Sequence, residues 1–136
     1  MKAIDLTKLT NYVDFGYFKP KVSRKNVDRS IKDRIKAWGL DHDYYDGSRS
    51  CGYGGFTDDG RWTKHLPRLL NLCSLDFEVS SSKSILDIGC KKGFIVDAAT
   101  QLGYSAIGVE NHLYPINQAN KRIKHKLLYA NYHDLP

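Results

Sequence analysis

Residues 84–93 read SILDIGCKKG, and the order of residue types in this stretch predicts a strand, a turn and a helix. Ser84 to Ile88 is a short apolar run, as expected for a parallel strand that is buried on both faces. In the turn that follows, Gly89 permits a sharp bend and Gly93 permits close packing where the helix begins. The N-terminus of such a helix offers unpaired N–H groups to a polar or anionic ligand group.

The same alternation continues downstream of this stretch. Apolar residues at helical spacing predict a helix that ends at Gly103: Phe94, Ile95, Ala98, Ala99 and Leu102. Residues 105–109 predict a second strand, closed by Glu110. A second helix follows, with Pro115 near its start and an apolar face of Leu113, Ile116, Ala119 and Ile123. With a third strand at residues 126–130, the pattern predicts a parallel α/β sheet with right-handed crossovers.

The chain upstream has a different composition, basic and aromatic with many loop residues. A helix is expected at about residues 25–38, capped by Ser23 and stopped by Gly39, with Val27, Ile31, Ile35 and Trp38 on one face. Residues 43–62 predict an ordered loop, since flexible linkers rarely carry so many large rings. A helix at about residues 63–73 requires Pro67 in its first turn. We therefore divide the chain into an extension, residues 1–76, and an α/β unit, residues 77–136.

Two acidic residues define the expected ligand chemistry. Asp87 lies two residues before Gly89, where a carboxylate repels a pyrophosphate but suits a ligand with a positive charge. Glu110 lies where an acid accepts hydrogen bonds from ribose hydroxyls. Both have plainer explanations, Asp87 as a cap of the turn and Glu110 as a solvated acid at a strand end. Together they favour an adenosyl amino acid over a dinucleotide, for which the GxGxxG spacing is also missing.

Three segments in this order, ILDIGCKKG, GVENHLYPINQA and YANYHDLP, resemble the class I S-adenosylmethionine-dependent methyltransferases. The resemblance implies the first three parallel strands of a three-layer αβα Rossmann-like core, preceded by a helical and loop extension. It implies S-adenosyl-L-methionine as the cofactor and a set of cofactor-binding residues: Asp87, Gly89, Cys90, Gly93, Glu110, Asn111, Asn131 and Tyr132. Lys91 departs from the pattern, since it stands where the middle glycine is usual. Its side chain can lean outward or crowd the methionine part of the cofactor.

Farther upstream, YYDGSRSCGYGGFTDDGRW resembles a tyrosine- and glycine-rich segment of some bacterial methyltransferases, several of them associated with sugar or polysaccharide pathways. This resemblance implies that Tyr53, Gly54 and Gly55 contact the cofactor or the substrate. Packing of these residues over the domain is an equal alternative.

The family resemblance implies direct transfer of a methyl group to a small-molecule acceptor, such as a sugar, with catalysis mainly by positioning. No catalytic residue can be assigned. His65, His112 and His133 are candidates only by residue type, with His42 and His125 behind them. No metal site is expected. Family members continue with four more strands, and strand four lies beside strand one. We therefore expect a truncated chain or a gene fragment in which residues 85–88 form an unpaired edge, with a complete small protein that borrows a partner's strand as the alternative.

The composition and the distribution of charge bear on other classes of function. The 136 residues carry a net charge of +6, concentrated in two basic stretches, residues 19–36 and 121–126. These predict solvated helix faces. The alternative functions are a non-catalytic nucleic-acid-binding module or an inactive methyltransferase fragment. The three cysteines form no CxxC pair, which favours reduced, structural thiols. With neither an apolar signal segment nor a membrane-spanning run, we expect a cytoplasmic protein.

Overall fold

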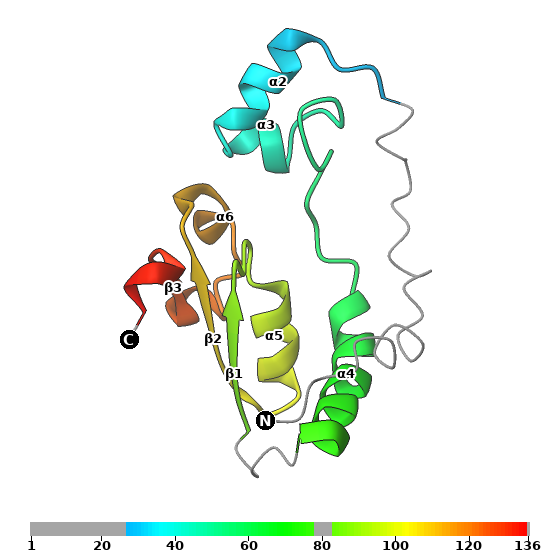
Figure 1. The fold of residues 1–136 in the computed structure, drawn as a ribbon, viewed down its shortest axis with the longest axis vertical. Coiled ribbons are helices and arrows are strands. Elements are labelled where there is room, and N and C mark those ends of the chain that lie inside the picture. The colour runs from blue at the N-terminus through cyan, green and yellow to red at the C-terminus, as the bar shows by residue number, and fades with distance from the viewer. Residues whose placement is uncertain (1–26, 78–82, 136) are drawn as a thin grey trace.

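The computed structural model describes residues 27–77 and 83–135. Its strands and the first crossover helix follow the predicted order (Figure 1). The elements are α2 (Ile31–Trp38), α3 (His42–Tyr45), α4 (Arg61–Phe77), β1 (Ser84–Ile88), α5 (Phe94–Gln101), β2 (Ser105–Glu110), α6 (Leu113–Asn117), the 3₁₀ turn η3 (Lys124–Lys126), β3 (Leu127–Tyr129) and the 3₁₀ turn η4 (Tyr132–Asp134).

The three strands form one parallel sheet in the order β1-β2-β3. In its register Ile88 lies opposite Val109, and Val109 lies opposite Leu128. This arrangement confirms the predicted α/β class with three parallel strands. It also brings the carboxyl ends of all three strands to one edge of the sheet, which is where open parallel sheets bind ligands.

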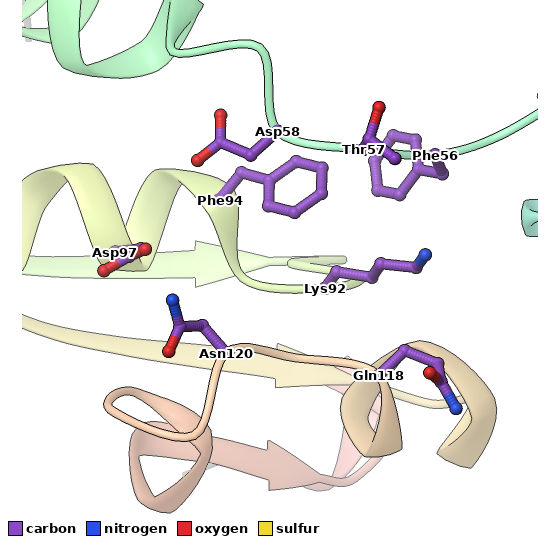
Figure 2. Close-up of a pocket in the computed structure, with 8 residues that line it drawn as sticks. All are labelled: Phe56, Thr57, Asp58, Lys92, Phe94, Asp97, Gln118 and Asn120. Atoms are coloured by element: carbon purple, nitrogen blue, oxygen red, sulfur yellow. The ribbon is translucent and has the colours of Figure 1, made fainter.

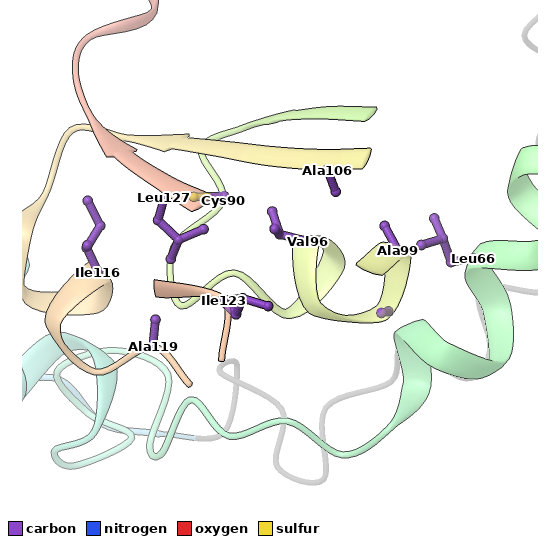
Figure 3. Close-up of a cluster of buried hydrophobic side chains, with 10 residues drawn as sticks. Leu66, Cys90, Val96, Ala99, Ala106, Ile116, Ala119, Ile123 and Leu127 are labelled. Atoms are coloured by element: carbon purple, nitrogen blue, oxygen red, sulfur yellow. The ribbon is translucent and has the colours of Figure 1, made fainter. Parts of the chain in front are cut away.

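One face of the sheet carries the hydrophobic core. Helix α5 packs against β1 and β2, and α4 packs against α5 on the side away from the sheet (Figure 1). Figure 3 shows the core side chains that meet between these elements. The buried cluster consists of Leu66, Cys90, Val96, Ala98, Ala99, Ala106, Ile116, Ala119, Ile123 and Leu127. Because Leu66 belongs to α4, the extension and the α/β unit share one core.

The other face of the sheet is open among the described residues. Leu86 and Ile88 of β1 are 56% and 57% exposed, and Ile107 and Leu128 on the neighbouring strands are 44% and 48% exposed. The prediction that β1 is buried on both faces is therefore wrong, because α4 and α5 lie on the same side. Within residues 27–77 and 83–135, β1 pairs with β2 alone, as expected of an edge strand.

Helix α2 begins later than predicted. Its N-cap is Ser30, whose side chain accepts from the Asp33 amide while the Asp33 carboxylate accepts from the Ser30 amide. This capping box satisfies two orphan donors and sets the start at Ile31. The predicted cap Ser23 lies outside the described residues. The predicted apolar face is not buried either, since Ile31 and Trp38 are 78% and 81% exposed.

Helix α4 begins two residues earlier than predicted. The carboxylates of Asp58 and Asp59 accept from the amides of Gly60 and Arg61, so the first amide of the helix and the one before it both have partners. Pro67 consequently lies inside the helix, not in its first turn. The structure tolerates it because Pro67 is exposed, so water can reach the carbonyl that loses its backbone donor.

The predicted second crossover helix is only one turn long. Helix α6 ends at Asn117, and the Asn120 side chain then accepts from the Arg122 amide in a separate turn. The apolar spacing nevertheless identified core residues correctly, since Ala119 and Ile123 are buried. Consecutive turns, not a continuous helix, bring these side chains into the core. A helix does not continue here because asparagine side chains hydrogen-bond nearby backbone in competition with it.

Candidate functional site

The turn between β1 and α5, residues 89–93, is built on left-handed backbone. Gly89, Lys91 and Gly93 have φ angles of 76°, 54° and 74°. A Cβ on Gly93 would come within 2.8 Å of Ile123, so glycine allows the close packing that the sequence predicted there. A Cβ on Gly89 would meet nothing within 4 Å. We call residues 89–93 the glycine turn; it leaves open space beside Gly89 at the strand edge.

Glu110 holds the glycine turn to the end of β2. Its side chain is 5% exposed, and Oε2 accepts from the Lys91 amide at 3.0 Å. Oε1 accepts from the amides of Asn111 and His112 at 2.9 and 3.0 Å and lies 2.9 Å from the His112 ring nitrogen Nδ1. A carboxylate has about four acceptor positions. Oε1 is therefore engaged within the protein, whereas Oε2 keeps a position for one further donor.

Asp87 is the second carboxylate at this edge. Its side chain is half-buried, and it has no hydrogen bond or ion pair among the described residues. Burial, and then the negative charge of Glu110, raise the pKa of Asp87 to about 6, while the positive charge of Lys91 acts in the opposite direction. A half-buried carboxylate without a partner destabilises its own ionised form.

This arrangement predicts that ionisation of Asp87 lowers the stability of the folded protein, so that the effect depends on pH. Because its pKa is raised from 3.8, the stability associated with its protonation is fully present below pH 3.8 and is lost as the pH rises through about 6. Asp87→Asn should therefore stabilise the protein by about 1–2 kcal/mol at pH 7.5, a value reduced for solvent screening, and by much less at pH 4. Urea denaturation of both proteins at the two pH values measures this; a difference independent of pH contradicts the prediction.

The predicted site residues do not all face this edge. The Cys90 side chain is 7% exposed and packs into the core, where a Cβ on Gly108 would come within 2.6 Å of its sulfur. Burial, followed by the charges of Asp87 and Glu110, raises the pKa of Cys90 to about 12. This thiol is therefore a packing group, and only the backbone of Cys90 belongs to the glycine turn.

Asn131 and Tyr132 stand at the carboxyl end of β3, on the strand next to Glu110. Asn131 caps η4, and the ring of Tyr132 is 59% exposed and lies 3.8 Å from the His133 ring. The Ala130 amide donates to the Glu110 carbonyl, which ties this segment to β2. Asp87, Glu110 and this pair thus stand at the carboxyl ends of three adjacent strands, at one edge of the sheet.

A segment from the extension completes the site. Residues 42–57, which we call the aromatic loop, pack their rings around Tyr45, which is 3% exposed. Tyr45 stacks on Tyr53 and on Tyr114, with ring centroids 5.8 and 5.9 Å apart. Lys91 donates a hydrogen bond to the Tyr53 hydroxyl, so the loop lies directly against the glycine turn. Gly54 and Gly55, at its exposed tip, both have positive φ angles.

Asp46 attaches the aromatic loop to the α/β unit. Its two oxygens lie 2.6 and 2.8 Å from the ammonium of Lys92, which is 8% exposed, and Oδ2 accepts from the Tyr114 hydroxyl at 2.8 Å. Burial acts to raise the pKa of Asp46, but the bonds from Lys92 and Tyr114 outweigh it and hold that pKa below its ordinary value. Sequence reasoning missed this cluster, because nothing in the local pattern indicates that Lys92 is buried and therefore needs a counter-charge.

A pocket of about 290 Å³ lies between the aromatic loop, the start of α5 and the residues after α6 (Figure 2). Its lining residues are Phe56, Thr57, Asp58, Lys92, Phe94, Asp97, Gln118 and Asn120. Asp97 is paired with Arg122 at 2.6 Å, and the rings of Phe56 and Phe94 stack with centroids 4.9 Å apart. None of the predicted cofactor-binding residues lines this pocket.

Other classes of site have less support in the described part of the chain. Within residues 27–77 and 83–135, no three histidine, cysteine, aspartate or glutamate side chains gather as a metal ion would need. In the same ranges, every helix is too short or too polar to cross a bilayer. Cys51 and Cys90 are free and buried. Of the candidate histidines, His112 contacts Glu110 and His133 contacts Tyr132.

Comparisons with protein-family models, with curated proteins and with solved structures found no match to this chain.

Proposed function

We propose that this chain binds S-adenosyl-L-methionine at the carboxyl ends of β1, β2 and β3, and that it carries the cofactor-binding part of a methyltransferase whose acceptor is a small molecule such as a sugar. The proposal includes the assignment of the parallel α/β fold to a three-layer methyltransferase core. Its main support is Asp87, a half-buried carboxylate without a described partner, beside the buried Glu110 and the open space at Gly89.

The electrostatics of this edge favour a ligand with a positive charge. Ionised Asp87 is disfavoured by burial and by Glu110, and a cation bound beside it would remove that cost. Perturbed carboxylates of this kind gather at functional sites, where burial and neighbouring charges shift the pKa. A pyrophosphate would add negative charge beside two carboxylates. The amino group of an adenosyl amino acid fits Asp87 better.

The other predicted residues supply hydrogen-bonding groups for the rest of such a ligand. Oε2 of Glu110 has one described donor, the Lys91 amide, and can accept from one ribose hydroxyl. Asn111, Asn131 and Tyr132 are exposed beside it, after the second and third strands, where an adenine ring would lie. The His112 ring, oriented by Glu110, adds a further polar group.

S-adenosylmethionine, when bound, supplies an electrophilic methyl group on a sulfonium. Held beside Asp87 and Glu110 at the carboxyl ends of β1 and β2, it would offer this methyl group to an oxygen or nitrogen atom of the acceptor. The residues of this chain would hold the reactants in line, which is where most of the rate gain of such a displacement arises. We assign no general base.

No described contact favours the alternative of a nucleic-acid-binding module. Lys36, in the first basic stretch, lies 3.3 Å from Asp43, and Arg122, in the second, is paired with Asp97. These charges are partly balanced within the protein.

Calorimetric titration with S-adenosylhomocysteine, which keeps the amino group and ribose of the cofactor, tests the proposed function. The intact chain should bind it, and Asp87→Asn should weaken binding about tenfold to a hundredfold, as expected for the loss of a charge-assisted hydrogen bond. Asp87→Asn is the informative variant because no described hydrogen bond depends on that carboxylate. Asp28→Asn, at an exposed position before α2, is the matched control. Absence of binding, or equal affinity in both variants, rejects the proposal.

A further inference from the structure

The ammonium of Lys91 lies in an aromatic environment beside the candidate site. It is 4.6 Å from the centroid of the Tyr53 ring and 5.3 Å from that of the Phe56 ring. It also donates to the Tyr53 hydroxyl. Both distances are within the range of about 6 Å in which a cation is attracted by the face of a ring. A cation is therefore favoured at this position, and in this structure Lys91 supplies it.

The backbone directs this lysine to the rings at a conformational cost. Lys91 has a φ angle of 54°, a left-handed conformation that is unfavourable for residues with a Cβ. Its amide is fixed by Oε2 of Glu110 at 3.0 Å, so the turn cannot relax without loss of that bond. Asp87 is close enough for the Lys91 charge to act on it. The ammonium thus lies beside two aromatic rings.

We propose that the rings of Tyr53 and Phe56 form a site for a small organic cation, and that the Lys91 ammonium occupies this site as a built-in competitor. Aromatic rings select quaternary ammonium and sulfonium groups, which bind through the ring faces and need few hydrogen bonds. The identification of the cation rests on the proposed function: the sulfonium of S-adenosylmethionine is the group that would replace the ammonium.

Lys91 competes with the cofactor through the positive charge of its ammonium group. S-adenosylmethionine carries a sulfonium, whereas S-adenosylhomocysteine has a neutral thioether in the same place. Two positive charges a few ångströms apart in a partly buried site repel each other strongly. Lys91 should therefore weaken binding of the cofactor about tenfold more than it weakens binding of the product, because both compounds share the amino group and only the cofactor carries the sulfonium charge. Lys91 would be a specificity-determining residue that makes the protein prefer product over cofactor.

Titration of four proteins with both compounds tests this discrimination: the intact chain, Lys91→Met, Lys91→Gly and Lys121→Met. Lys91→Met removes the charge and keeps the chain length, and Lys91→Gly suits the left-handed backbone. In both, the affinity for S-adenosylmethionine relative to that for S-adenosylhomocysteine should be about tenfold higher than in the intact chain. Lys121→Met, which removes an exposed charge elsewhere, should alter neither affinity. An unchanged affinity ratio in both Lys91 variants overturns the inference.

A probe without an adenosine group separates this inference from the proposed function. Trimethylsulfonium chloride, followed by NMR of the aromatic ring protons, should bind Lys91→Met weakly and the intact chain at least tenfold more weakly still. Adding Phe56→Leu to Lys91→Met should abolish that binding, because it removes one of the two rings of the site. If the probe binds Lys91→Met while neither adenosyl compound binds any variant, the cation site stands and the proposed cofactor fails. If the adenosyl compounds bind but the probe does not distinguish the variants, the cation site fails.

Discussion

Replacement of Asp46 by alanine should destabilise the protein by about 3 kcal/mol, because it leaves the ammonium of Lys92 buried without a counter-charge. Lys92 is 8% exposed, and its two described ion-pair contacts, at 2.6 and 2.8 Å, both go to Asp46. The same change removes the acceptor of the Tyr114 hydroxyl and of the Phe56 amide. The value is at the low end of the range for buried pairs because the Asp46 side chain is 23% exposed.

Urea denaturation followed by circular dichroism measures this effect, and the chain offers a matched control. Asp43 lies in the same loop and pairs with Lys36 at 3.3 Å, but both side chains are more than 40% exposed. Asp43→Ala should therefore cost about 0–1 kcal/mol. Addition of Lys92→Met to Asp46→Ala should restore part of the stability, because the uncompensated charge is removed. Equal losses for Asp43→Ala and Asp46→Ala would contradict this account.

The effect of Asp46 should also depend on pH. Because its pKa lies below the ordinary value in the folded protein, its contribution is present above the unfolded value near 3.8 and is lost as the pH falls through the lowered folded value. The difference between the intact protein and Asp46→Ala should thus shrink in acid. The contribution of Asp87 to stability has the opposite pH dependence, since its raised pKa makes ionisation of this carboxylate costly near neutral pH.

Replacement of Gly52 by alanine should be at least as damaging, with a loss of about 3 kcal/mol or more. A Cβ on this residue would lie 1.9 Å from the carbonyl oxygen of Tyr44, and backbone cannot yield as a flexible side chain can. The same carbonyl accepts from the Tyr53 amide at 2.8 Å. Relief of the clash must therefore separate the two halves of the aromatic loop and displace Tyr53 from Lys91.

Gly55 is the control for this substitution. It has a φ angle of 96°, so alanine there is strained, but its Cβ would meet nothing within 4 Å. Gly55→Ala should cost only about 1–2 kcal/mol, the penalty of the left-handed backbone. Near-ultraviolet circular dichroism reports the packing of the tyrosine rings and should be reduced by Gly52→Ala alone. A similar loss of signal in both variants would show that the predicted clash is not the cause.

Both predictions concern the attachment of the aromatic loop, and this attachment links the extension to the candidate site. The adjacent lysines of the glycine turn have separate roles: Lys92 pairs with Asp46, and Lys91 faces Tyr53 and Phe56. Loss of Asp46 should therefore also disturb the rings of the proposed cation site. The packing of Tyr53 over the domain, which the sequence left as an alternative to ligand contact, is observed; ligand contact remains part of the proposal.

The sequence by itself was sufficient for the features that depend on short-range pattern. The strands β1, β2 and β3, the glycine turn and helix α5 all follow from apolar runs, helical spacing and glycines within a few residues of one another. Glu110 and Asp87 could likewise be placed at one edge of the sheet, because parallel strands align their carboxyl ends. The apolar spacing was less informative where local hydrogen bonds compete with a helix. After α6, the Asn120 side chain makes such a bond by accepting from the Arg122 amide.

Only the tertiary structure decided what these side chains contact. Asp46 meets Lys92 and Tyr114 across 46 and 68 residues of sequence, and Lys91 meets Tyr53 across 38. Periodicity identifies which side chains are buried, but it carries no information on partners so distant in the chain. The same holds for Asp87, whose raised pKa depends on burial and on the charge of another strand. The sequence determined where the carboxylates lie; packing determined their charge, their partners and the cation beside them.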